Sequence, residues 1–132
     1  MVGLFPPLVA SLKKRVKELI VFELKECIAE GIVPAEKASL ELPRCDIALI
    51  TSTSLINGTI DSLIAFSSNC REIVLLGGST PLLPEIFRPL GVSLLSGVIV
   101  SDPLGLLRAI SEGGGRRSIE NHVHKVNMRL KT

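Results

Sequence analysis

The residues best suited to chemistry form a glycine-hydroxyl turn directly after an apolar run at 73–76. The turn consists of Gly77, Gly78, Ser79 and Thr80. An unbroken apolar run predicts a strand buried on both faces, as in a parallel sheet flanked by helices. Ser79 or Thr80 can cap a following helix, Pro81 suits its first position, and the free N–H groups at such a start favour an anion. The turn therefore predicts a phosphate or carboxylate site.

Other polar turns are expected beside this one, because the loops after parallel strands share one edge of the sheet, where ligands bind. The candidate ligand-binding residues at this edge are Phe5, Pro6, Glu23, Thr53, Asn57, Gly58, Thr59, Gly77, Gly78, Ser79, Thr80 and Asp102. The edge offers two carboxylates but no His, Lys, Arg or Cys, so it lacks the nucleophile and base that acyl transfer needs. It is better suited to holding a small anionic ligand than to breaking bonds, although ordinary turns use the same residue types.

Metal ligands are sought elsewhere, at His122 and His124. On a strand both imidazoles would point to one face and could share a transition metal, but a stable site needs further ligands. The three cysteines, Cys27, Cys45 and Cys70, are far apart in the sequence. Their odd number argues against a disulfide framework and favours small, mostly buried thiols.

The elements that position these residues alternate between strands and helices. Strands are expected at 1–5, 19–24, 46–51, 73–76 and 92–100, with helices opening at Pro6, near Thr59, at about 82 and after Asp102. This alternation predicts an α/β fold with a mainly parallel sheet of five or six strands and helices on both of its faces. At 123–130 apolar and polar residues alternate, which predicts a C-terminal edge strand and is compatible with antiparallel pairing.

Several local features complete this expectation. Val9, Leu12, Val16 and Leu19 are expected to form one apolar helix face, and 25–45 is expected to be a loop with one short helical turn at 35–41. Leu106, Leu107 and Ile110 are expected to supply the buried face of the helix that Asp102 caps. Glu23 occupies the place where a Rossmann fold holds a ribose, but the turn at 3–7 lacks Gly-x-Gly-x-x-Gly and its prolines remove N–H donors. Dinucleotide binding is therefore poorly supported.

Composition limits the class of protein. A chain of 132 residues predicts one domain. A net charge of +2, without interleaved basic and aromatic residues, gives no support for nucleic-acid binding. No apolar run approaches the ~20 residues of a membrane span. The start, Met-Val-Gly-Leu-Phe-Pro-Pro, has no basic n-region, so we expect a cytoplasmic protein.

Five sequence blocks carry a resemblance over about residues 2–130. They are Phe-Pro-Pro-Leu-Val, Val-Phe-Glu-Leu, Thr-Ser-Leu-Ile-Asn-Gly-Thr-Ile-Asp, Leu-Leu-Gly-Gly-Ser-Thr-Pro-Leu-Leu-Pro and Gly-Val-x-Val-x-Asp-Pro. In this order they resemble the putative heavy-metal chelation domain, a prokaryotic family of unknown function. The resemblance implies a three-layer α/β/α, Rossmann-like domain, a metal chelated between two domains, and a link through gene neighbourhoods to corrinoid metabolism. Its motif residues fall here on Phe5, Pro6, Pro7, Glu23, Thr53, Asn57, Gly58, Thr59, Ser79, Thr80, Pro81 and Asp102.

This chain departs from many members of that family, which carry an additional N-terminal domain. The resemblance then favours a small-ligand-binding domain that handles a heavy metal or a metal complex. Two alternatives stay open: a transferase-like enzyme that binds a phosphate- or nucleotide-containing ligand at 77–80, and an interaction subunit that completes its site with a separately encoded companion domain. A homodimer through Leu4, Phe5 and the strand at 123–130 is also expected, because two-fold dimers are the commonest oligomers.

Overall fold

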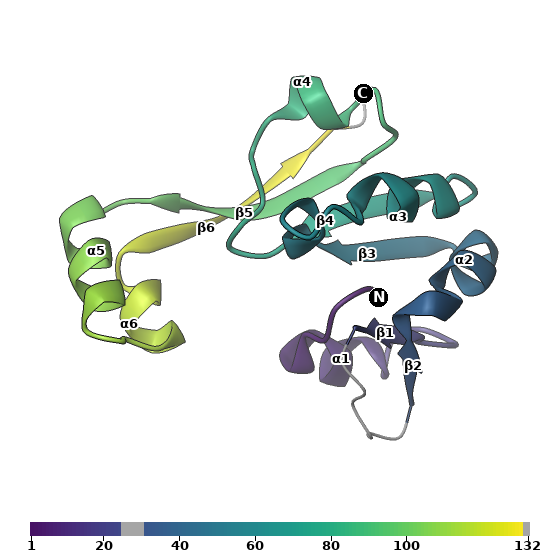
Figure 1. Ribbon diagram of the computed structural model, residues 1–132, viewed down its shortest axis with the longest axis horizontal. Helices are drawn as coiled ribbons and strands as arrows, with labels where there is room; N and C mark the ends of the chain where they lie inside the picture. Colours follow the sequence, from purple (N-terminus) through teal and green to yellow (C-terminus); the bar gives the residue numbers. More distant parts are fainter. Residues whose placement is uncertain (25–30, 131–132) are drawn as a thin grey trace.

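The computed structural model describes residues 1–24 and 31–130, which form a mixed α/β fold (Figure 1). The helices and strands are, in chain order, α1 Pro6–Leu12, β1 Val21–Glu23, β2 Ile32–Pro34, η1 Ala35–Lys37, α2 Ala38–Glu41, η2 Leu42–Arg44, β3 Ile47–Thr51, η3 Ser52–Leu55, α3 Ile60–Phe66, β4 Glu72–Leu76, α4 Pro84–Phe87, β5 Leu94–Val100, α5 Pro103–Ser111, α6 Arg116–Glu120 and β6 Val123–Arg129. None of the helices in this described part is long and apolar enough to cross a membrane.

The strands form two sheets that a single residue joins. Strands β1 and β2 pair in parallel, and β3, β4, β5 and β6 form the larger sheet in that order. Val2 lies between the two sheets and makes parallel bridges to Phe22 in β1 and Ile50 in β3. Its N–H donates to the Leu49 carbonyl at 2.7 Å, and its own carbonyl accepts from the Thr51 N–H at 3.0 Å.

The first segment of the chain is therefore central, with β1 and β2 on one side of it and β3, β4 and β5 on the other. This is the strand arrangement of a Rossmann fold, whose ligands bind where the direction of chain progression reverses. Strand β6 pairs antiparallel with β5. The predictions of a mainly parallel sheet and of an antiparallel C-terminal edge strand are thus confirmed.

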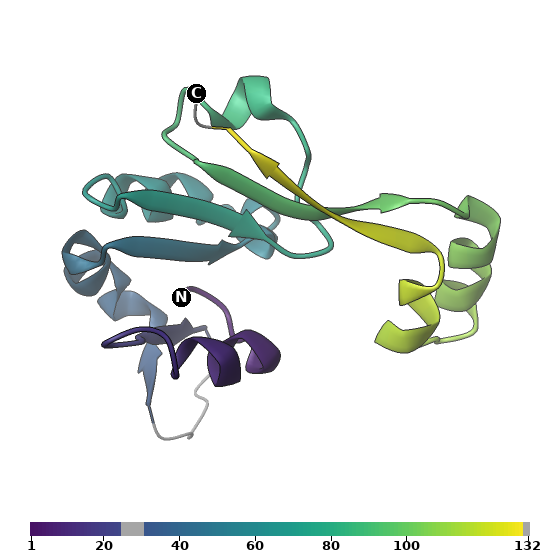
Figure 2. The same cartoon turned by 180° about the vertical axis from the view of Figure 1, so that it is seen from behind.

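The core lies between the sheet and the helices that cover it. Phe22, Ile50, Leu75 and Leu95 are fully buried on the strands. Helix α3 lies in front of β3 and β4 in Figure 1, whereas α1 is nearest the viewer in Figure 2. The core contains few aromatic rings, as the 3% aromatic content requires.

Several local expectations were wrong. The first helix ends at Leu12, so Val16 and Leu19 do not extend its apolar face. A short strand, β2, occupies 32–34 inside the stretch expected to be a loop, because the β-branched pair Ile32 and Val33 can pair with β1. The helix after the glycine-hydroxyl turn starts only at Pro84, since the intervening residues pack as an extended loop.

Strands β5 and β6 extend beyond the rest of the sheet. On β5, β4 pairs with Leu94, Leu95 and Ser96 only, whereas β6 pairs with β5 along its whole length. The remaining ribbon projects from the body and carries α5 and α6 at its tip, as both ribbon views show. We call this part of the chain, residues 97–126, the arm.

Candidate functional site

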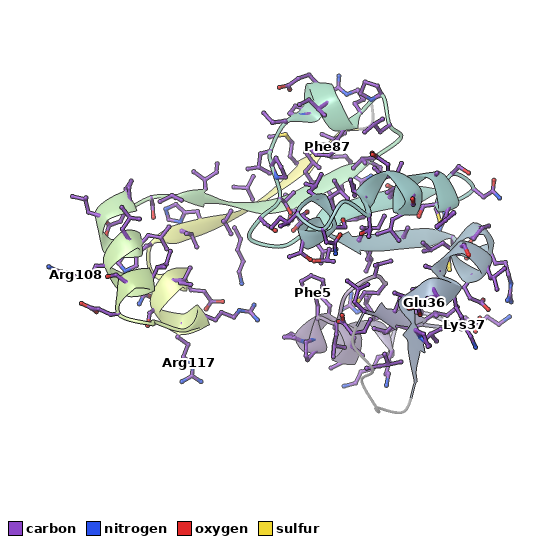
Figure 3. All side chains as sticks on the ribbon, in the orientation of Figure 1. Phe5, Glu36, Lys37, Phe87, Arg108 and Arg117 are labelled. Carbon is purple, nitrogen blue, oxygen red and sulfur yellow. The ribbon has the colours of Figure 1, made fainter. Side chains whose placement is uncertain are left out.

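A cavity of about 530 Å³ opens at the carboxyl ends of Val2, β1 and β3, where a Rossmann fold binds its ligand. Its apolar lining includes Phe5, Phe22, Leu63 and Phe66. The full set of lining residues is Val2, Gly3, Leu4, Phe5, Phe22, Glu23, Leu24, Ala35, Glu36, Ala38, Ser39, Thr51, Thr53, Ser54, Asn57, Gly58, Thr59, Ser62, Leu63 and Phe66. In Figure 3, Phe5 and Glu36 lie on the same side of β3, from turns far apart in the sequence.

The turn after Val2 forms one wall of the cavity and depends on a glycine. Gly3 has a φ of +89°, and a Cβ built there would lie 2.9 Å from the Thr51 side chain. The Glu23 carboxylate fixes the same wall, because it accepts hydrogen bonds from the N–H groups of Leu4 at 3.1 Å and Leu24 at 2.8 Å. Glu23 therefore holds backbone in place, whereas in a Rossmann fold the acid at this position holds a ribose.

The loop at 51–59 forms another wall of the cavity and is stiffened by its own hydroxyls. The Oγ1 atoms of Thr51 and Thr53 lie 2.9 Å apart, and the Ser54 hydroxyl donates to the Thr51 carbonyl at 2.7 Å. Asn57 Oδ1 accepts from both the N–H and the hydroxyl of Thr59. The wall thus presents preformed polar groups, which fix a ligand's orientation without losing much entropy on binding.

The glycine-hydroxyl turn lies beside the cavity and does not line it. The Thr80 hydroxyl is 2.7 Å from the hydroxyl of Ser52, and both side chains are buried. The Gly77 N–H donates to the Ser96 carbonyl, and the Thr80 N–H donates to the Gly77 carbonyl. No helix begins at this turn, so the physical basis for an anion cradle at Gly78 and Ser79 is weaker than the sequence indicated.

Asp102 lies far from the cavity because β5 carries it out to the arm. One of its carboxylate oxygens caps α5 by accepting from the Gly105 N–H at 3.0 Å, as its sequence position predicted. The other lies 2.9 Å from Nδ1 of His122. The hydrogen bond from Gly105, and to a smaller extent the one with His122, holds the pKa of the Asp102 carboxyl below its usual range. The imidazole packs so closely on Gly105 that any Cβ there would overlap it.

These contacts bear on the expected metal site. His122 already uses one nitrogen on Asp102, and His124 lies on the exposed ribbon opposite Ile99. Within residues 1–24 and 31–130, no group of three or more His, Cys, Asp or Glu side chains could hold a metal ion. Cys45 and Cys70 are half-buried free thiols, and burial raises the pKa of both, which disfavours the thiolate that binds metals. Cys27 lies outside the described residues.

The charge of the cavity differs from the expectation of an anionic ligand. The charged side chains that line it in the described chain are Glu23 and Glu36, both acidic, and no Lys, Arg or His accompanies them. The first turn of α1 supplies no N–H groups from Pro6 or Pro7, and the Leu8 and Val9 N–H groups donate to the Phe5 carbonyl. A phosphate would therefore meet two carboxylates, and the described residues that line the cavity offer no Lys, Arg or His to compensate them.

A second cavity, of about 720 Å³, lies at the opposite ends of the strands. It is lined by both acidic and basic side chains, including Glu18, Arg44, Arg71 and Arg129. The first cavity holds Phe5, Glu23, Thr53, Asn57, Gly58 and Thr59 from the predicted set, which makes it the better candidate. Sequence reasoning missed Glu36, Ser62 and Phe66. Their signal was weak, because the short helical turn expected at 35–41, which contains Glu36, is not one of the turns that directly follow a predicted strand. Phe66 was expected on the inward face of its helix.

Comparison with known proteins places this geometry in context. The family described as putative heavy-metal chelation, DUF364, matches residues 1–129. A DUF364 crystal structure of unknown function from Desulfitobacterium hafniense is 33% identical, with a TM-score of 0.85 over 97% of this chain and 50% of that one. Another, from Pyrococcus horikoshii, is 24% identical with a TM-score of 0.90 over 97% of this chain and 52% of that one. An uncharacterized protein of Methanocaldococcus jannaschii, MJ0500, is 29% identical over 103 residues, which are 76% of this chain and 40% of MJ0500.

Proposed function

This chain belongs to the DUF364 family, described as putative heavy-metal chelation, and we propose that its switch-point cavity binds a small organic molecule that is uncharged or positively charged. We further propose that any metal reaches this domain as a complex with such a molecule. Since the chain spans about half the length of its solved relatives, the proposal concerns this domain alone.

The observation that carries the proposal is the lining of the cavity. Phe5, Phe22 and Phe66 offer an apolar surface to a ring, while the hydroxyls of the 51–59 loop offer hydrogen bonds to its polar groups. With Glu23 committed to backbone N–H groups, Glu36 is the carboxylate best placed to face a positive charge. A phosphate- or nucleotide-containing ligand is disfavoured at this place by the same charges.

The described residues do not fit a free metal ion, because they contain no cluster of three or more ligating side chains. Structural and catalytic metal sites need at least three protein ligands. A bound chelator removes this requirement, since it supplies the ligands to the metal itself. For this reason the proposal assigns chelation to the small molecule and recognition to the protein.

A matched series of ring probes tests the charge preference. The probes are 2-naphthylmethylamine, 2-naphthalenemethanol and 2-naphthoate, which are respectively cationic, neutral and anionic near pH 7. Titrations followed by amide NMR shifts should give tighter binding of the amine and the alcohol than of the carboxylate. Glu36→Gln should weaken the amine about two- to fivefold, the range of an exposed ion pair, and leave the alcohol unchanged.

A pair of serine substitutions locates the binding. Ser62→Phe fills the cavity and should abolish binding of all three probes, whereas Ser68→Phe, at an exposed position beyond α3, should leave it intact. Equal affinities for the amine and the carboxylate would contradict the proposed charge preference. Binding that survives Ser62→Phe would place the ligand site elsewhere.

A further inference from the structure

The arm has few contacts with the body of the molecule. Helix α5 packs against α6, and α6 packs against β6, while both helices stand away from the sheet in Figures 1 and 2. Arg108 and Arg117 extend from this tip away from the body (Figure 3). Each alignment with the two solved relatives covers 97% of this chain, so most of the arm lies within the aligned part.

Helix α5 has two apolar faces, and only one of them is covered. Gly105, Leu106 and Ala109 face inward and are buried or half-buried. The outward face consists of Pro103, Leu104, Leu107, Ile110 and Ser111, which share one side of a helix of 3.6 residues per turn. The exposed fractions of Leu104, Leu107 and Ile110 are 80%, 64% and 55%. Our expectation that Leu107 and Ile110 face the core was therefore wrong.

An arm built in this way is poorly stabilised by itself. Two-stranded ribbons and helices shorter than ~12 residues are marginal in water without a partner. Of the α5 and α6 side chains, all of which the structure describes, Ala109 is the buried one. Ile99 and Val100 on the ribbon are also 51% and 43% exposed. An apolar surface of several hundred Å² on a small protein usually marks an interaction site.

The pattern on the outward face is self-complementary. Leu104, Leu107 and Ile110 are evenly spaced, so an antiparallel copy of α5 centred on Leu107 would place Leu104 against Ile110 of the partner subunit. None of the five outward residues is charged, so this packing brings no charge out of water. In a two-fold dimer both subunits contribute the same patch, so the total buried area is twice that of one patch. This brings the buried area toward the ≈ 1,000 Å² that a specific interface needs.

We propose that the arm is a dimerisation device, in which α5 packs antiparallel against α5 of a second copy of this chain. This surface differs from the one expected from the sequence. Phe5 is half-buried at the cavity and Leu4 is 37% exposed, whereas Leu104, Leu107 and Ile110 on the arm are all more exposed. The proposal is independent of what the cavity binds.

Sedimentation velocity of the 132-residue chain from about 1 to 100 μM tests the proposal. We expect a dimer for the unmodified chain. For Leu107→Glu we expect the dissociation constant of the dimer to rise about a hundredfold or more, because both subunits carry the substitution at the centre of the interface. The matched control is Leu40→Glu, since Leu40 is 70% exposed on α2, in the body. A monomer throughout for the unmodified chain, or an unchanged dimer for Leu107→Glu, would overturn the proposal.

Two further variants separate the interface from any effect on folding. In Leu107→Cys the new thiol lies at the proposed axis, so mild oxidation should give a disulfide between two identical peptides, mapped by mass spectrometry. Leu40→Cys should give none. Replacement of 101–122 by Asn-Gly joins Val100 to Val123, which are directly paired, and should give a folded monomer. Failure of Leu107→Cys to cross-link, or a dimer that survives without the tip, would refute the assignment.

Discussion

Removing one partner of the buried hydroxyl pair Ser52 and Thr80 should destabilise the protein more than removing both. The side chains are 0% and 6% exposed, their oxygens lie 2.7 Å apart, and the pair joins the cavity loop to the glycine-hydroxyl turn. Ser52→Ala leaves the Thr80 hydroxyl buried without this partner, and Thr80→Val does the same to Ser52. Each substitution should lower the free energy of unfolding by about 1–3 kcal/mol.

The double variant Ser52→Ala/Thr80→Val removes both hydroxyls and leaves neither unsatisfied. Its destabilisation should therefore be well below the sum of the single effects, which gives a coupling energy of about 1–2 kcal/mol between the two residues. Urea unfolding followed by circular dichroism, at one protein concentration for all variants, measures these values. Thr80→Ser keeps the hydroxyl and removes only the methyl group, so it shows what a change of side-chain shape costs at this position when the pair stays intact. Single effects that add within about 0.5 kcal/mol would show that the hydroxyls do not act as a pair.

Three other predictions concern separate parts of the molecule. Gly3→Ala should lower the free energy of unfolding by about 1–3 kcal/mol in the same urea assay, because its φ of +89° disfavours any Cβ; an unchanged midpoint would contradict this. The pKa of Asp102 is lowered on folding, so its carboxylate should protect the Gly105 amide from hydrogen exchange at neutral pH, and this protection should be lost as pH falls through the lowered pKa. Hydrogen exchange at a series of pH values measures this, with Asp102→Asn as the control. Cys45 and Cys70 should react with iodoacetamide more slowly than free cysteine at pH 8, by peptide mass spectrometry, because burial raises their pKa.

The parallel sheet could be predicted because its strands are short apolar runs bounded by glycine, proline and hydroxyl residues. The apolar run at 73–76 lies in β4 and the alternating segment at 123–130 forms β6, because in both places the hydrophobic pattern and the residues that bound it indicate the same strand. Strand β2 could not be predicted with the same ease. Three residues carry little periodicity, and their pairing with β1 depends on a contact across the intervening segment.

The cavity was predicted in part. Asn57, Gly58 and Thr59 lie in it because the carboxyl ends of neighbouring parallel strands meet at one edge. Asp102 also follows a parallel strand, but β5 continues beyond the residues that pair with β4, so Asp102 lies on the arm and not at the cavity. The end of this strand was predicted at residue 100, but the point at which β4 stops pairing with it, Ser96, depends on tertiary pairing, which the sequence of β5 alone does not reveal. The second carboxylate of the cavity, that of Glu36, was not predicted, because only the folded chain brings it to this edge.

The position of Val2 has a consequence for how cooperatively the protein unfolds. In the described chain, Val2 links the two sheets through backbone bridges, to Phe22 in β1 on one side and to Ile50 in β3 on the other. Opening at this seam separates the smaller sheet from the larger without breaking any pairing inside β3 to β6. Residues 1–24 and the β2 segment thus form a natural subglobal unfolding unit, whose amides should exchange at a lower free energy than those of β4. Since the seam also forms the floor of the cavity, a ligand bound there would raise that free energy and bring the two units closer to a single transition.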